Sequence, residues 1–233
     1  MNAIDPSVLP ADALAEDLSS RGYAQRMLLP PDTCQALADL YDEDSHFRKR
    51  IIMEQRAYGR GEYKYFTYPL PQAVADLRAA LYPPLAKVAN AWQRVLGKDA
   101  TFPPDLDTYL ARCHAAGQTR PTPLLLRYGP EGFNCLHQDL YGELVFPLQV
   151  TVLLSAPGRD FTGGEFMLVE QRPRAQSRGI VVPLQQGEAV IFPVRERPTQ
   201  GTRGSYRLTM RHGVSRITSG QRHTLGLIFH DAA

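Results

Sequence analysis

Cysteine is scarce in this sequence, which has three cysteines among its 233 residues. Cys34, Cys113 and Cys135 are odd in number and widely spaced, with no C-x-x-C pattern among them. The composition therefore predicts neither a disulfide framework nor a thiolate zinc site. A reducing compartment fits such a chain, and we expect a cytoplasmic protein.

Long apolar runs and a basic leader are lacking as well. The beginning, MNAIDPSVLPADALAED, has acids and prolines where a signal peptide needs basic residues followed by a continuous apolar core. The longest apolar run, LVFPLQVTVLLSA, contains Pro147 and Gln149 and is too short to span a bilayer. We therefore expect a soluble protein that is not exported and has no membrane partner.

Neither sign of charge is in clear excess, since 26 Lys and Arg residues stand against 24 Asp and Glu residues. A formal net charge of +2 does not by itself indicate nucleic acid or membrane as a partner. From Arg159 to Arg222, however, eleven arginines stand against five acids. This basic half could neutralise phosphates, or its arginines could simply line solvent-facing strands and loops.

Helical periodicity dominates the first half of the chain. Apolar residues recur at three- and four-residue spacing in DTCQALADLYDED and in QAVADLRAALYPPLAKVANAWQRVLG. The second segment predicts a long helix over about 71–97, whose apolar stripe needs a sheet to pack against. Between the two helical segments, KRIIMEQRAYGRGEYKYFTYPL predicts a hairpin around Gly59 and Gly61. We expect residues 1–120 to form a mostly helical part.

After RPTP the period changes to two, and short strand-like runs follow one another with turn sequences between them. The runs are LLLRYG, VFPLQVTVLLS, GEFMLVEQ, GIVVPL, EAVIFPV, YRLTMRHGV and RHTLGLIFH. Many short strands with little helix between them indicate an antiparallel barrel or double-sheet roll. The sequence therefore predicts an α+β chain that is mainly β in its C-terminal half. Its length suits one domain over 1–233, with 121–233 as the β core.

The stretch FNCLHQDLYGE places His137 and Asp139 two residues apart. In a strand this spacing puts both side chains on the same face, so they can converge on one point. One carboxylate and two imidazoles form the facial arrangement that holds non-heme Fe(II) and leaves adjacent positions open. Taken alone, the pair also fits an exposed strand end.

A second imidazole has to come from elsewhere in the chain. His46 and His114 belong more readily to helix surfaces or helix ends. His212 lies in a late strand, and His223 and His230 flank the last strand on opposite faces. All three of these later histidines remain open on the residues alone.

Arg222 begins the strand that follows His212. A guanidinium there can form a bidentate pair with a carboxylate, as the distal end of a metal-chelating organic acid would require. The alternative is a solvated arginine at the start of a strand. Its offset from His212 across the SRITSGQ turn favours a functional role.

The order HQD, GGEF, GEAVIF and HGVSRITSGQRHTLGLIFHD, over about Thr122 to Asp231, resembles the Fe(II)- and 2-oxoglutarate-dependent dioxygenases. The ending also resembles a bacterial oxygenase family named for oxidative demethylation of damaged DNA. The resemblance implies a double-stranded β-helix, or jelly roll, with N-terminal helices packed on one sheet. It also implies Fe(II), 2-oxoglutarate as cosubstrate and O2, with succinate and CO2 as products.

The resemblance carries over to particular residues. His137, Asp139 and His212 match the iron ligands, which are also the catalytic residues. Arg222 matches the anchor of the distal carboxylate of 2-oxoglutarate, and Tyr128 and Thr224 match positions that add hydroxyl contacts.

The sequence leaves three possible functions. The DNA-demethylating enzymes carry an asparagine between two arginines after the distal histidine, whereas HGVSRITSGQR has Arg216 and Arg222 without it. An oxygenase acting on alkylated nucleic acid therefore remains one alternative, and an oxygenase acting on a protein side chain or small metabolite is the second. The third, a non-catalytic ligand-binding roll, is disfavoured by the intact site. Aromatic residues of the hairpin could stack an extruded base or pack on their own sheet. They are Tyr58, Tyr63, Tyr65, Phe66 and Tyr68.

Overall fold

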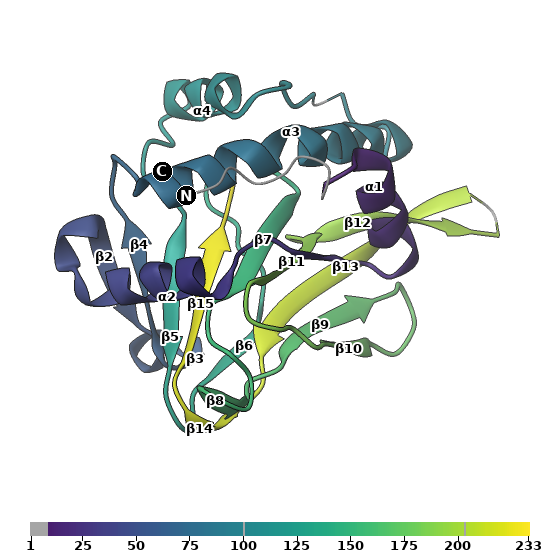
Figure 1. Cartoon of the computed structure of the whole chain (residues 1–233). Coiled ribbons are helices and arrows are strands. Elements are labelled where there is room, and N and C mark those ends of the chain that lie inside the picture. Colours follow the sequence, from purple (N-terminus) through teal and green to yellow (C-terminus); the bar gives the residue numbers. More distant parts are fainter. Residues whose placement is uncertain (1–8, 100, 203) are drawn as a thin grey trace.

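The structure, a computed structural model that describes residues 9–99, 101–202 and 204–233, has helices packed on one of two antiparallel sheets (Figure 1). Helix α3 (Gln72–Val95) crosses the sheet, with α4 (Leu106–Ala115) beyond it and α1 (Ala11–Ser20) at one end. Helix α2 (Pro31–Asp39) packs near the last strand. The predicted long helix is thus confirmed. Within the described ranges, no helix combines the length and apolar character that a membrane span requires.

The larger sheet has seven strands, all paired antiparallel. Its order is β1 (Ala24–Met27), β11 (Glu188–Pro193), β7 (Leu148–Leu153), β15 (Arg222–Leu227), β5 (Leu124–Tyr128), β4 (Glu62–Phe66) and β2 (Phe47–Ile52).

The second sheet is also antiparallel and faces the inner side of the first. Its order is β10 (Arg178–Val182), β9 (Phe166–Gln171), β13 (Gly204–Val214), β6 (Phe133–His137) and β3 (Gly59–Arg60), and β12 (Glu196–Gly201) also pairs with β13. Strands β8 (Phe161–Gly163) and β14 (Ile217–Gly220) form a separate pair.

Strand β7 shows how the period of two separates the layers. Leu148, Val150 and Val152 belong to the core between the larger sheet and the helices. Leu153 belongs to the second core, which lies between the two sheets, and Gln149 lines a cavity on that same inner side. Alternation along one strand therefore directs apolar residues to the helices and a polar residue to the interior of the roll.

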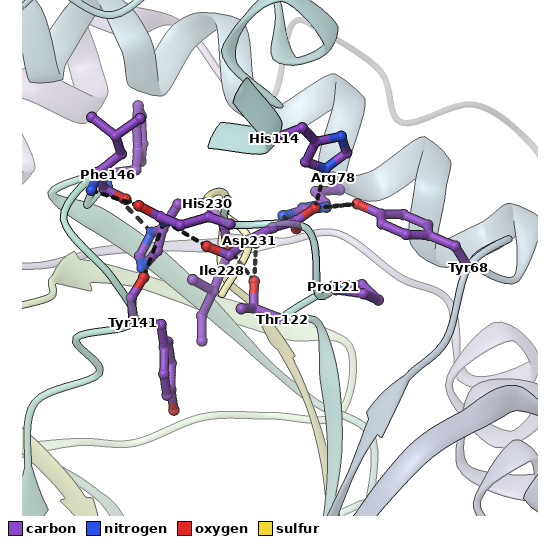
Figure 2. A network of polar contacts seen from close by, with 12 residues as sticks. Tyr68, Arg78, His114, Pro121, Thr122, Tyr141, Phe146, Ile228, His230 and Asp231 are labelled. Carbon is purple, nitrogen blue, oxygen red and sulfur yellow. Dashed lines mark hydrogen bonds and ion pairs between the residues drawn. The ribbon is translucent and has the colours of Figure 1, made fainter. Parts of the chain in front are cut away.

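A buried polar network fixes the chain just after β15 (Figure 2). Arg78 of α3 donates to the carbonyl of Ile228 (2.9 Å) and to Asp231 Oδ1 (2.9 Å). The same carboxylate accepts hydrogen bonds from Tyr68 (2.8 Å) and lies 2.8 Å from His114 Nε2. Because a buried ion pair is stable only when its remaining polar atoms are satisfied, these contacts tie the end of the sheet firmly to the helices.

The fold confirms the α+β prediction, with antiparallel sheets that dominate the second half. The hairpin between β2 and β4 is confirmed as well. The expectation of a mostly helical first part needs one correction. Strands β1, β3 and β4 of that part pair with β11, β6 and β5, so the first 120 residues also complete both sheets.

Candidate metal centre

Two histidines on neighbouring strands and one aspartate lie together inside the roll. His137 is the last residue of β6, and His212 is its register partner on β13, with ring centroids 4.1 Å apart. Asp139 follows β6, and its oxygens lie 3.6 Å from His137 Nε2 and 3.3 Å from His212 Nε2. One donor atom from each residue lies within 4.8 Å of the others. The three side chains can therefore bind one metal ion.

The histidines that the sequence left as alternatives lie elsewhere. The ring of His223 is 5.9 Å from that of Tyr41. His230 is buried, and its Nδ1 accepts a hydrogen bond from the backbone N–H of Phe146 (3.2 Å). In the part of the chain that the structure describes, neither joins the cluster of donor atoms. The geometry selects His212.

The backbone next to His212 is irregular. The register between β6 and β13 shifts between His212 and Val214, which is the mark of a β-bulge and a common feature beside functional sites. A side chain at Gly213 would place its Cβ 2.7 Å from the carbonyl oxygen of Asn134. Only glycine permits this close approach of β13 to β6, the two strands that carry the histidines.

The electrostatics suit a metal. Burial raises the pKa of the Asp139 carboxyl, but the hydrogen bond from His212 and the charges of both histidines outweigh it and hold the pKa well below its usual range. Burial, with repulsion from His137, lowers the pKa of His212 despite its contact with Asp139. At neutral pH the cluster thus offers an anionic carboxylate and a neutral imidazole, the forms that bind metals.

Further side chains orient these donors. His137 Nδ1 donates to the carbonyl of Cys135 (2.7 Å), which leaves the lone pair on Nε2 free for a metal. The Tyr141 hydroxyl donates to Asp139 Oδ1 (2.9 Å) and accepts from the Tyr65 hydroxyl (3.0 Å). The donors are therefore held in place before any ion binds.

We expect Tyr141→Phe to weaken metal binding about tenfold, because Asp139 loses the donor that fixes one of its oxygens. Anaerobic titration calorimetry with Mn(II) measures this affinity. Tyr23→Phe is the matched control, since Tyr23 does not line the cavity that holds the donors. An unchanged affinity in Tyr141→Phe would show that the hydroxyl does not orient Asp139.

Arg222 is fully enclosed, with 1% of its surface exposed. Among the described residues, its Nε and Nη1 have no hydrogen-bond partner. Burial lowers the pKa of the guanidinium to about 10, which leaves it cationic at neutral pH. Gly164 lies against it, because a Cβ there would be 3.0 Å from Arg222 Cδ and 2.1 Å from Ile217 Cδ1. Gly164, the second glycine of GGEF, thus makes room for this side chain.

One cavity of about 690 Å³ is lined by His137, Asp139, His212 and Arg222. Tyr128 and Thr224, the two hydroxyl residues singled out by the resemblance, also line it and are buried. Tyr128 is the register partner of Arg222, and its hydroxyl accepts from Asn134 Nδ2 (3.3 Å). All six site residues of the sequence prediction therefore face one space.

The residues fit a ferrous ion and an organic diacid. Two imidazoles and one carboxylate form the donor set of non-heme Fe(II) sites. A buried guanidinium with unpaired N–H groups is costly unless a carboxylate meets it. The fold and this combination together define the class of Fe(II)- and 2-oxoglutarate-dependent oxygenases, which use O2 and oxidise their substrates.

Known structures share the fold. A prolyl-4-hydroxylase from Pseudomonas putida aligns with a TM-score of 0.52 at 16% identity, over 93% of this chain and 96% of that one. A 2OG-Fe(II) oxygenase family oxidoreductase from Burkholderia pseudomallei gives 0.51 at 15%, over 96% and 92%. At such identities the likeness concerns the fold alone.

Sequence comparison identifies the family. Residues 61–232 match the family described as "Oxygenase, catalysing oxidative methylation of damaged DNA", and the chain belongs to it. The uncharacterised protein Rv2227 of Mycobacterium tuberculosis (strain H37Rv) is 52% identical over 191 residues, which cover 80% of this chain and 82% of that protein.

Asn134, Tyr141 and Gln149 line the cavity and hydrogen-bond to the site residues, but the sequence analysis gave none of them a role. Gln149 carries a signal, because it is a polar residue within the apolar run LVFPLQVTVLLSA. Tyr141 stands two residues after Asp139, a spacing that again suggests a shared face.

Proposed function

We propose that this oxygenase oxidises alkylated nucleic acid, with Fe(II) held by His137, Asp139 and His212 and the distal carboxylate of 2-oxoglutarate held by Arg222. The observation that carries the proposal is the shared cavity, which joins a metal donor set to an enclosed, unpaired cation. We infer further that the two antiparallel sheets around it form a double-stranded β-helix. In this class, bound Fe(II) supplies the O2 activation that couples conversion of 2-oxoglutarate to succinate and CO2 with oxidation of the substrate.

The chain's own residues bind and orient the cosubstrate. Arg222 neutralises the distal carboxylate through a charge-assisted pair, which is strong because the guanidinium is buried. Thr224 lies two residues along the same strand and faces the same cavity, so its hydroxyl can add a hydrogen bond. Tyr128 already accepts from Asn134, which leaves its own O–H free to donate.

The mouth of the cavity supports a polyanionic, stackable substrate. Lys49 and Arg56 line it and are exposed, and no acid pairs with either among the described residues. Tyr58, with 49% of its surface exposed, lies on the same side, and Tyr63 and Tyr65 meet edge to face deeper in. Aromatic faces and unpaired cations are what proteins use to bind unstacked nucleotides.

The arginine-rich half contributes less than its composition suggests. Arg222 is its one member that lines the cavity within the described residues. Arg197 is buried against Glu170 (2.5 Å), and Arg159 pairs with Asp160. Because some of these arginines already pair with acids and Arg222 lies deep inside, the β2–β4 hairpin is the better candidate for phosphate contacts at the cavity.

The alternative is hydroxylation of a protein side chain or a small metabolite. Leu136 and Leu140 also line the cavity, and both are exposed, at 40% and 42%. An apolar rim of this kind suits an apolar substrate. The asparagine missing between Arg216 and Arg222 points the same way.

To test the proposal, anaerobically purified protein is supplied with Fe(II), 2-oxoglutarate, O2 and methylated single-stranded DNA or RNA. We expect formaldehyde and succinate in equal amounts. Binding should weaken with salt by a log–log slope of about −0.7 per phosphate neutralised. Lys49→Ala with Arg56→Ala should make that slope shallower by about 1.4, the sum for two contacts.

Arg159→Ala is the matched control, because it removes an exposed arginine that does not line the cavity. Its salt dependence should equal that of the unchanged protein. Succinate without formaldehyde, together with binding that does not respond to salt, would contradict the nucleic-acid substrate and favour the hydroxylase alternative.

A further inference from the structure

Gln149 is the polar side chain of β7 that reaches the metal-binding cluster. It is 3% exposed, and its Nε2 lies 3.0 Å from Asp139 Oδ2 and 3.2 Å from His212 Nε2. Its Oε1 is buried with no hydrogen-bond partner in the described chain. One amide thus contacts two of the three donor residues and has an acceptor left over.

The orientation of this amide follows from its neighbours. If Oε1 faced Asp139, two acceptors would meet at hydrogen-bonding distance, which is repulsive. The amino group therefore donates to Asp139 Oδ2, and its nitrogen also lies 3.2 Å from His212 Nε2, the atom that would bind a metal.

The second amide hydrogen of Gln149 has no acceptor on His212 once that ring binds a metal. The single lone pair on His212 Nε2 cannot bind a metal and accept a hydrogen bond at once. Because Gln149 is 3% exposed, an unsatisfied N–H there would be unfavourable. That N–H therefore needs an acceptor that arrives with the metal or after it.

The sheet register shows where that acceptor would come from. Strands β7 and β15 are paired so that Leu153 lies opposite Thr224, two residues from Arg222. Gln149 lies four residues before Leu153 on β7, and therefore farther from Arg222. Arg222 thus stands near one end of the inner face and Gln149 near the other, beside the metal donors. A diacid anchored at Arg222 would present its opposite, chelating end to Gln149.

We propose that Gln149 is a cosubstrate-positioning residue: beside the metal donors, its amino group donates a hydrogen bond to the chelating 2-oxo acid end of 2-oxoglutarate. This inference rests on the proposed function, because it requires 2-oxoglutarate at Arg222. It makes Gln149 a link between metal binding and cosubstrate binding. An ordinary packing role for the side chain would not produce such a link.

The test measures the affinities for 2-oxoglutarate and for Mn(II) in two variants of Gln149. Both variants should bind 2-oxoglutarate more weakly, whereas Mn(II) binding should not weaken in the Glu variant. At saturating Mn(II), Gln149→Leu should raise the Kd for 2-oxoglutarate about tenfold, the loss expected for a hydrogen bond to a charged acceptor. Gln149→Glu should raise it further, because a carboxylate there repels the cosubstrate. The same Glu variant should bind Mn(II) at least as tightly as the unchanged protein, since the new charge attracts the cation. Anaerobic calorimetry measures both constants.

Controls separate this inference from the proposed function. Gln186→Leu makes the same chemical change outside the cavity, where Gln186 bonds to the carbonyl of Leu154, and should leave both constants unchanged. Gln149→Asn retains the amide and serves as the conservative variant. Thermal unfolding checks that each variant is folded. If the unchanged protein binds 2-oxoglutarate through Arg222 but Gln149→Leu and Gln149→Glu bind it within about twofold of that affinity, this inference is wrong and the proposed function stands. If the unchanged protein binds none, the proposed function fails.

Discussion

Replacing His212 by alanine is expected to abolish turnover and to weaken metal binding by more than the roughly 10- to 100-fold typical of losing an outer-shell partner. The reason is that His212 supplies one of three donor atoms that converge within 4.8 Å. The two that remain, on His137 and Asp139, come from one short segment and would supply only two of the three donors. The fold should survive, because the lost contacts, mainly with Phe166 and Phe192, correspond to a typical core cost of about 1–3 kcal/mol.

Three measurements check this result: Mn(II) affinity by calorimetry, succinate formation under O2, and thermal unfolding. His223→Ala is the control, since this histidine was an alternative in the sequence and lies beside Tyr41. It should retain metal binding. Turnover that persisted in His212→Ala would overturn the assignment and return His223 and His230 as candidates for the third ligand.

The parts of the fold that could be predicted are those with a strong apolar period. The stripe of α3 follows from burial on one face, and the apolar runs of β7 and β11 follow from burial on both faces. Strands β6, β12 and β14 could not be found in this way. Most of their residues are exposed or half-buried, so their pairing with β3, β13 and β8 decides their structure.

In the candidate site, too, features set by neighbours in the chain could be predicted, whereas features set by long-range packing could not. His137 and Asp139 are neighbours in the chain, so local geometry sufficed to pair them. The choice of His212 required the register of β13 against β6, which is a long-range feature that spacing does not encode. That Arg222 is enclosed without a hydrogen-bond partner for Nε and Nη1 among the described residues is likewise a result of packing, which the arginine-rich composition around it did not indicate.

Replacing Arg222 by alanine is expected to raise the Kd for 2-oxoglutarate roughly ten- to a hundredfold at saturating Mn(II). A charge-assisted pair contributes about 1.5–3 kcal/mol, and each 1.4 kcal/mol is a factor of about ten in affinity. Arg222 is suited to this role because it is enclosed, keeps its charge with a pKa of about 10, and leaves Nε and Nη1 unpaired among the described residues. Arg222→Lys should recover only part of the affinity, since an ammonium cannot form the two parallel bonds.

The free energy of unfolding without ligand should not fall together with the affinity for 2-oxoglutarate. An enclosed cation without a partner destabilises the protein in the absence of an acid, so Arg222→Ala should leave its free energy of unfolding unchanged or higher. The extra stabilisation that 2-oxoglutarate gives the unchanged protein should be largely lost, because that increment depends on the ratio of ligand concentration to Kd. Arg216→Ala is the control, as Arg216 is exposed and pairs with Glu131. If Arg222→Ala kept both the affinity and the stabilisation by 2-oxoglutarate, the anchor of the distal carboxylate would lie elsewhere in the cavity.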